Sequence, residues 1–235
     1  LDADADSSIT ADTDDQIDFR AGGTDVMAMS TTGLTITNAA NTAQLTLKST
    51  DADANDGPLL SLSRDSSSPA DGDLTGRINF NADNDAGEVT AFSSITTFIR
   101  DASDGTEDGG MQLNHMLGGS EVTAFEIDND EYVINQGSND VDFRVEGNGD
   151  THALFVQASD DKVGINNSSP VEMLTIGTTS DAASRIQFLT STSGNATIHF
   201  GDGTSADAYR GYINYGHDTD SLEFSTAGSE RMRIQ

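Results

Sequence analysis

The chain has 235 residues, of which 11 are basic and 40 are acidic, so its formal net charge is −29 at pH 7. Such a field opposes the binding of nucleic acid and of anionic lipid, because both are held through basic patches. Cysteine is absent, which excludes disulfides and thiolate metal sites. No apolar run approaches the ~20 residues that a membrane-spanning helix requires, so we expect no insertion into a bilayer.

The composition is also poor in core-forming residues. Apolar residues make up 34% and aromatic residues 6% of the chain, whereas globular domains average about 45–50% apolar residues. Two interpretations follow: the chain is partly disordered, or it forms a thin, repetitive body whose core is completed by other chains. The regular alternation of apolar and polar residues favours the second interpretation, because disordered acidic chains seldom carry it.

Strand signals follow one another along the whole chain, whereas no long segment has the apolar spacing of a helix. Each signal is a short run with period 2, and Gly, Asn, Asp or Ser residues bound it. The sequence therefore predicts an all-β chain of short strands joined by Gly, Asp and Asn turns. In chain order the alternating runs are residues 15–20, 26–29, 34–37, 45–48, 60–64, 75–80, 140–145, 153–156, 185–189, 197–200, 210–215, 220–225 and 231–234.

Two sequence templates recur. The first is an acidic residue followed by an apolar–acidic–Phe alternation, a Gly-containing turn and a second alternating run, and it occurs at residues 15–29, 140–156 and 220–234. The second is Thr-Gly-Arg-Ile-Asn-Phe at residues 75–80 and Arg-Gly-Tyr-Ile-Asn-Tyr at residues 210–215. Recurrence of short strand–turn–strand units is typical of modular, elongated proteins.

The repeats divide the chain into five stretches whose order of short and long units suggests stacking along an axis. The chain begins without Met and stops within a strand pattern, so we expect a fragment or processed form of a polypeptide that continued beyond Gln235. The stretches are residues 1–44, the first Asp-Phe unit; 45–138, a long sheet module with loops at 49–58, 64–73 and 81–88; 139–169, the second Asp-Phe unit; 170–217, a shorter sheet module; and 218–235, the start of a third Asp-Phe unit.

An Asp-Phe unit is too small to bury its own apolar face, because a two-stranded hairpin alone is marginal in water. Three copies around a three-fold axis would give the inward apolar side chains partners and would cover open strand edges. We therefore predict an elongated homotrimeric fibre of stacked β-prism or interwoven triple β-helix modules. The outward Asp, Ser and Thr side chains are expected to face water.

Two segments resemble a known family. Residues 161–176, Asp-Lys-Val-Gly-Ile-Asn-Asn-Ser-Ser-Pro-Val-Glu-Met-Leu-Thr-Ile, are similar to the Lys-Val-Gly-Ile-Gly-Thr-x-Ser-Pro segment of bacteriophage tail fibres and related virion appendages. Residues 210–215 through 229–234 resemble their Gly-x-Ile-x-Tyr to Glu-Arg-Met-Arg-Ile segment, and the Asp-Phe-Arg units resemble repeats in fibres of marine and cyanobacterial phages. The similarity covers most of the chain, most densely residues 139–235. Asn166-Asn167 replaces the usual Gly-Thr, which leaves the local turn type open.

The resemblance implies a virion protein on the tail or another external appendage. It implies a homotrimer whose further partners are other virion proteins and a host surface receptor, with a glycan as one candidate. It also implies that a C-terminal intramolecular chaperone, which assists trimerisation and cleaves itself off, follows Gln235. We predict a structural shaft segment that contributes to host-receptor binding. Two alternatives stay open: an extracellular filament or cell-surface adhesin that itself binds glycans or calcium, and a polysaccharide-degrading spike.

Metal and catalytic signals are weak, and we predict no catalytic, cofactor-binding or metal-ligating residues. Residues 51–57 and 81–87 resemble the start of a calcium loop, but the Gly comes one position late, and Leu62 and Phe92 stand where a bidentate Glu is needed. With 40 acids, any apparent carboxylate pair is uninformative, and neither a Gly-x-Ser-x-Gly elbow nor a tryptophan platform for sugars occurs. The scattered histidines share no ligand spacing; they are His115, His152, His199 and His217.

Basic residues are scarce, and several arginines fall in or beside the recurrent units. The first hypothesis is that they pair with Asp or Glu of neighbouring copies and fix the register between chains. The alternative is ordinary surface pairing, which contributes only ~0–1 kcal/mol for each pair. The arginines concerned are Arg20, Arg144, Arg210, Arg231 and Arg233.

Overall fold

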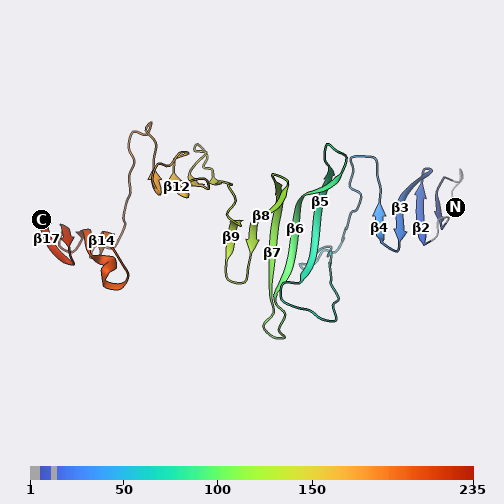
Figure 1. Ribbon diagram of the computed structural model, residues 1–235, viewed down its shortest axis with the longest axis horizontal. Coiled ribbons are helices and arrows are strands. Elements are labelled where there is room, and N and C mark those ends of the chain that lie inside the picture. Colours follow the sequence, from blue (N-terminus) through green and yellow to red (C-terminus); the bar gives the residue numbers. More distant parts are fainter. Residues whose placement is uncertain (1–5, 12–14) are drawn as a thin grey trace. The chain divides into compact units, whose positions relative to one another are not determined.

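The computed structural model describes residues 6–11 and 15–235 of the chain. Within this part the protein is all-β, because strands and turns alternate and no α-helix is present (Figure 1). The strands form four sheets, each built from strands that follow one another in the sequence. The chain divides into two units, Leu1–Gly76 and Arg77–Gln235. Residues 1–5 and 12–14, which belong to the first predicted stretch, lie outside the described residues.

The first sheet is antiparallel and confirms the first predicted hairpin. Its central strands are joined at Gly22 and Gly23, whose φ angles of 58° and 74° lie in the left-handed region that glycine adopts without a steric penalty. The strands pair in chain order. They are β1 (Ser8–Thr10), β2 (Gln16–Ala21), β3 (Thr24–Ser30) and β4 (Gly33–Ile36).

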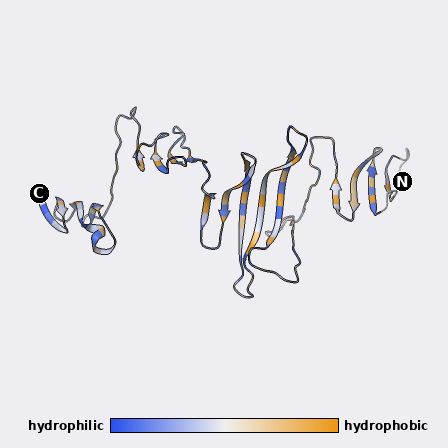
Figure 2. Cartoon of the chain, viewed as in Figure 1, coloured by the Kyte–Doolittle hydropathy of each residue, from blue (hydrophilic) through white to orange (hydrophobic). Residues whose placement is uncertain are grey.

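The second sheet has five strands in chain order and includes the longest strand, β6, of 13 residues. Figure 2 shows that hydrophobic and hydrophilic residues alternate along its strands, as the period of 2 requires for a sheet with two unlike faces. The predicted strand at residues 75–80 is confirmed within β5. The strands are β5 (Leu74–Asp83), β6 (Val89–Asp101), β7 (Asp108–Leu117), β8 (Ser120–Ile127) and β9 (Tyr132–Gln136).

The third sheet is short-stranded, and its last pair is parallel. Residues 140–142 of the predicted run 140–145 lie outside its strands. Asn166 takes a φ of 52°, so the departure from the resembled phage segment falls on a position where Gly is preferred and Asn is tolerated. The strands are β10 (Phe143–Val145), β11 (Leu154–Gln157), β12 (Lys162–Ile165) and β13 (Leu174–Ile176).

The fourth sheet is antiparallel and confirms the predicted strands at residues 197–200, 210–215, 220–225 and 231–234 to within a residue or two at their ends. A 3₁₀ helix, η1 (Ser205–Tyr209), was not predicted and connects its first two strands. Pairing in the third and fourth sheets runs across the expected boundaries 169/170 and 217/218. The strands are β14 (Asn195–Phe200), β15 (Gly211–Gly216), β16 (Ser221–Thr226) and β17 (Ser229–Ile234).

Three predicted strands do not form in the single chain. Residues 45–48 and 60–64 belong to a strand-free stretch between β4 and β5, and residues 185–189 belong to another between β13 and β14. The predicted loops at 49–58 and 64–73 lie in the first stretch, whereas residues 81–83 of the third predicted loop belong to β5. Alternation alone does not make a strand, because the backbone of a strand needs a neighbour with which to exchange hydrogen bonds.

The distribution of buried side chains is the opposite of that in an ordinary hydrophobic core. Among the described residues the buried apolar side chains are Phe98 and Phe155. Many large apolar side chains are exposed, and most buried side chains are polar. We predicted that Ser and Thr side chains face water, but several of them are buried. The buried polar residues are Asp18, Ser94, Thr96, Asn114, Glu126, Asn214, Ser221 and Ser225.

Candidate functional site

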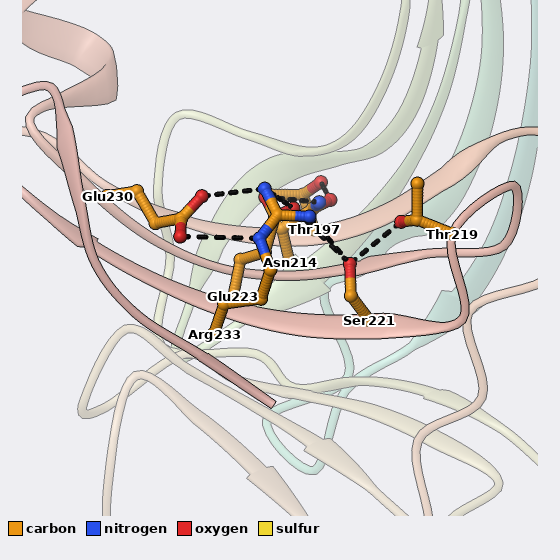
Figure 3. Close-up of polar contacts among 7 residues, drawn as sticks. All are labelled: Thr197, Asn214, Thr219, Ser221, Glu223, Glu230 and Arg233. Carbon is orange, nitrogen blue, oxygen red and sulfur yellow. Dashed lines mark hydrogen bonds and ion pairs between the residues drawn. The ribbon is translucent and has the colours of Figure 1, made fainter. Parts of the chain in front are cut away.

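A ladder of polar side chains crosses the whole β14–β17 sheet (Figure 3). Its members lie directly opposite one another in the register of the four strands, and successive side chains on one strand point to opposite faces, so all of them share one face. We call this set the polar ladder. From β14 to β17 it consists of Thr197, Asn214, Glu223 and Arg233.

Hydrogen bonds join each member of the polar ladder to the next. Thr197 Oγ1 donates to Asn214 Oδ1 over 2.6 Å, and Asn214 Nδ2 donates to Glu223 Oε2 over 3.3 Å. The second oxygen of Glu223, Oε1, lies 2.6 Å from Nη2 of Arg233. Both carboxylate oxygens of Glu223 are therefore occupied, so this acid does not stand free as a general base.

Arg233 also binds two residues beside the polar ladder. Its Nη2 lies 2.6 Å from Glu230 Oε2, and its Nη1 donates to Ser221 Oγ over 3.1 Å. The hydrogen bond from Arg233 holds the pKa of the Glu230 carboxyl below its ordinary value, and the same bond raises the pKa of Arg233. The hydroxyls of Ser221 and Thr219 are 2.8 Å apart. One arginine thus links β16 to β17 by several charge-assisted bonds.

The β5–β9 sheet carries a comparable network. Asn114 Nδ2 donates to the hydroxyls of Ser94 and Thr96 over 3.2 and 3.3 Å, and Asn114 Oδ1 accepts from Thr123 Oγ1 over 2.8 Å. These contacts tie β7 to the strands on both sides of it. A buried amide that meets three partners in this way stabilises the sheet and fixes its register.

Arg77 extends this network through Glu121, and Arg100 forms a separate cluster on the same sheet. Arg77 Nη2 binds Glu121 over 2.6 and 2.7 Å, and Ser94 Oγ donates to Glu121 over 2.8 Å. The hydrogen bond from Arg77, with that from Ser94, lowers the pKa of Glu121. Arg100 pairs with the buried Glu126, lies 2.7 Å from Asp128, and places its guanidinium carbon 4.2 Å from the ring centre of Phe98.

A shallow groove lies at one end of the polar ladder. It encloses about 250 Å³, and its aromatic wall is His199 with Tyr212. The His199 ring also meets Tyr209 of η1 edge-on at 4.9 Å between ring centres. This aromatic cluster could not be predicted from the sequence, because these residues become neighbours only through strand pairing and η1. The remaining lining residues are Asn195, Thr197, Asn214 and Glu223.

No protein-family model matches this chain, and no curated protein is significantly similar to it. What the arrangement does must therefore be argued from the residues themselves. No helix among the described residues is both long and apolar enough to traverse a bilayer.

The two calcium-like segments form hydrogen-bonded turns. Asp53 accepts from the backbone and side-chain nitrogens of Asn55 over 2.9 and 2.7 Å, and Asn84 Oδ1 accepts from the backbone nitrogens of Ala86 and Glu88 over 3.0 and 2.9 Å. These side chains stabilise their turns by accepting hydrogen bonds from nearby backbone nitrogens. In the described part of the chain, no three His, Asp or Glu side chains gather in a way that could hold a metal ion.

The four histidines are not brought together. His115 lies on β7, and each of the other three contacts an aromatic ring: His152 meets Phe155, His199 meets two tyrosines and His217 meets Tyr215.

The recurrent arginines have partners in their own chain, as ordinary surface pairing predicts, and their pairing with neighbouring copies stays a hypothesis. The nitrogen–oxygen distances are 2.9 Å for Arg20–Asp25, 2.6 Å for Arg144–Glu146 and 3.4 Å for Arg210–Asp207. Arg231 Nε donates to Thr226 Oγ1 over 3.1 Å, and Arg233 belongs to the polar ladder. Sequence reasoning missed Arg77 and Arg100 because their partners, Glu121 and Glu126, are distant in sequence. The alternating Ser and Thr residues of β6 were the available signal of a paired polar face.

Proposed function

We propose that this chain is a structural shaft segment of a homotrimeric fibre, of the tail-fibre or virion-appendage type that its sequence resembles. The role is mechanical: the trimer projects, or contributes to, a host-receptor binding tip. Its place is the tail or another external appendage of the virion, with other virion proteins as neighbours. The observation that carries the proposal is an uncovered row of apolar side chains on every one of the four sheets.

Each row runs straight across its sheet through residues that lie directly opposite in the register. Since side chains alternate between faces, a row of directly opposite residues lies on one face. The rows are Ile9–Phe19–Met27–Ile36 on β1–β4, Ile95–Leu113–Phe125–Ile134 on β6–β9, Phe143–Val156–Val163–Leu174 on β10–β13, and Ile198–Ile213–Phe224–Met232 on β14–β17.

The apolar rows are open in the single chain. Ile9 is 67% exposed, Ile134 51% and Met232 49%. Exposed contiguous apolar surface on a water-soluble protein marks a site of association, because its burial is favourable by roughly 25 cal/mol per Å². Each of the four sheets lacks a second layer that would cover its apolar row. Other copies of the chain would supply that layer for all four sheets.

Three copies are favoured over two by the resemblance to trimeric fibres and by geometry. Three single-layer sheets around an axis form a prism in which each apolar row faces inward and meets two others. The polar ladder of the last sheet and the Asn114 network of the β5–β9 sheet lie on the opposite faces, where they join the strands without needing a core. A stiff trimer of this kind presents several weak binding tips at high effective concentration.

Light scattering on the purified 24.7 kDa chain, with and without EDTA, tests the proposal. We expect a mass three times that of the chain, unchanged by EDTA. The variant Ile198→Asp puts a charge in an apolar row and should yield monomers, whereas Asn195→Asp on the other face of the same strand should leave the trimer intact. A monomer of the unaltered chain would contradict the proposal, and a trimer that dissociates in EDTA would show that calcium, not the rows, holds it together.

A further inference from the structure

Three segments carry the strand pattern but have no strand partner, and two of them come shortly before the outer strand of a sheet. Residues 60–64, Leu-Ser-Leu-Ser-Arg, and residues 185–189, Arg-Ile-Gln-Phe-Leu, alternate apolar and polar residues, and we call them the donor segments. They belong to the described part of the chain, yet neither makes a backbone-to-backbone hydrogen bond there. Their apolar side chains are exposed to solvent: Leu60 60%, Leu62 53%, Ile186 64% and Phe188 51%.

The donor segments carry positive charge, as some of the paired strands do. The chain has only 11 basic residues against 40 acidic ones, yet each donor segment contains an arginine and neither contains an acid. The third strand pattern that stays unpaired, residues 45–48, shares this composition and contains Lys48. A cationic, apolar strand fits a strongly acidic partner, and a second copy of this chain carries −29.

Each donor segment precedes an open sheet edge. Residues 60–64 come before β5, which is the outer strand of the β5–β9 sheet, and residues 185–189 come before β14, which is the outer strand of the β14–β17 sheet. An edge strand presents unpaired backbone N–H and C=O groups and accepts a further strand readily. Each donor segment thus comes shortly before an outer strand in the chain.

We propose that the donor segments of one copy pair as additional strands with these edges in a neighbouring copy: residues 60–64 with β5, and residues 185–189 with β14. The inference rests on the proposed homotrimer, and it names the backbone contacts that would hold the copies in register. The donated strand pairs with the free backbone groups of the edge and places Ile186 and Phe188 beside the apolar row that begins at Ile198.

The partner is a neighbouring copy and not the same chain. Only residues 190–194 separate the second donor segment from β14, and Gly194 N already donates to Ser191 O over 3.0 Å in a tight turn. The loop-closure cost of such a short connection is small. The single chain nevertheless does not form a hairpin between residues 185–189 and β14. A short connection along the chain is therefore not enough to pair the donor segment. A neighbouring copy supplies both an edge and the second layer that covers the apolar side chains.

Cross-linking between two chains that carry different single cysteines tests the inference. Only the introduced cysteines react, because the chain has no cysteine of its own. One chain carries Phe188→Cys, and a second chain, lengthened by a tag, carries Ile198→Cys. After co-assembly, a short flexible bis-maleimide should join the two into a dimer of mixed size. Chains with Phe188→Cys and Tyr132→Cys are the control, because Tyr132 is highly exposed on β9 of another sheet, and they should give no such product.

Hydrogen exchange supplies a second measurement, in which the donor segments themselves are unaltered. The amides of residues 60–64 and 185–189 should exchange more slowly in the trimer than in the monomeric Ile198→Asp variant, by about tenfold or more. If light scattering shows a trimer but these amides stay unprotected, or the cross-link forms only within one chain carrying both cysteines, the inference is overturned and the trimer stands. If light scattering shows a monomer, the proposed function itself is overturned.

Discussion

At the scale of single residues, the recurring template has a conformational cause. Asp15, Asp161 and Asp220 each stand directly before a strand and have φ angles of 63°, 54° and 45°. In this left-handed region Asp and Asn are several times more frequent than other non-glycine residues. The acidic residue that opens two of the three template copies, at positions 15 and 220, therefore works as a turn residue, and its charge also keeps the turn soluble.

Asp161 offers a direct test of this role. We expect Asp161→Val to lower the free energy of unfolding by about 1–2 kcal/mol, because a β-branched side chain clashes with the backbone at positive φ. Asp161→Gly should cause no loss. Asp160→Val, one position earlier in the same turn and outside the left-handed region, is the matched control. Denaturant unfolding of the variants measures the effect, and equal losses at both positions would contradict the conformational explanation.

Gly110 is required for a different reason, which is space. It lies opposite Phe98 in the register of β6 and β7, and a Cβ placed on it would come within 2.1 Å of the Phe98 ring and 2.9 Å of Ile127 O. One of the buried apolar side chains thus packs over a glycine. The neighbouring Gly109 has room, since its Cβ would meet nothing nearer than Phe98 O at 3.6 Å.

The expected outcome is that Gly110→Ala lowers the free energy of unfolding by about 1–3 kcal/mol through overpacking. Gly109→Ala should stay within about 0.5 kcal/mol of the unaltered chain. Melting temperatures at one fixed protein concentration make the comparison valid for an oligomer. A loss at Gly109 as large as that at Gly110 would mean that glycine flexibility, and not the Phe98 contact, matters in this strand.

At the scale of elements, a strand could be predicted from the sequence where its neighbouring strand is nearby in the chain. The hairpins formed by β2 with β3 and by β16 with β17 were predicted, because alternation and a glycine turn specify them locally. The patterns at residues 60–64 and 185–189 are as regular, but neither segment pairs with a strand in the single chain, so alternation alone did not decide whether a strand forms. The polar networks escaped prediction because Arg77 and Glu121 meet only through sheet pairing.

The Arg77–Glu121 contact makes the β5–β9 sheet sensitive to acid. Hydrogen bonds from Arg77 and Ser94 hold the pKa of Glu121 below its ordinary value of 4.5. A lowered pKa in the folded state contributes stability that is present above the unfolded pKa and is lost as the pH falls through the folded pKa. Both side chains are more than one-third exposed, so solvent screening keeps the effect modest.

We therefore expect the melting temperature to fall between about pH 5 and about pH 3, and to fall less steeply in Glu121→Gln, which is less stable at neutral pH. Glu172→Gln removes an exposed carboxylate for which the structure shows no arginine partner, and it should keep the slope of the unaltered chain. Thermal melts across this range provide the measurement. A Glu121→Gln curve parallel to that of the unaltered chain would show that the contact with Arg77 contributes nothing in solution.

At the scale of the whole molecule, charge opposes the assembly that the apolar rows favour. A trimer carries three times the −29 of one chain, which is −87. Repulsion between exposed charges reaches about 30 Å at 0.01 M salt but only about 10 Å at 0.1 M and about 3 Å at 1 M. The free energy gained by burying the apolar rows is nearly independent of simple salts. The balance between this gain and the charge repulsion therefore shifts with ionic strength.

The trimer should accordingly become more stable as sodium chloride increases from about 0.01 M to about 1 M, with the largest gain at the low end where screening changes most. Light scattering and thermal melts at a fixed protein concentration follow the trimer fraction. Sodium, magnesium and calcium chlorides at equal ionic strength separate screening from a specific cation site. Similar curves for magnesium and calcium, both somewhat above sodium, fit an acidic assembly without dedicated calcium ligands, in line with the turn geometry at Asp53 and Asn84. A rise with calcium alone would instead require ligands contributed by more than one copy, and a trimer that weakens as salt increases would mean that ion pairs and not apolar rows hold the copies together.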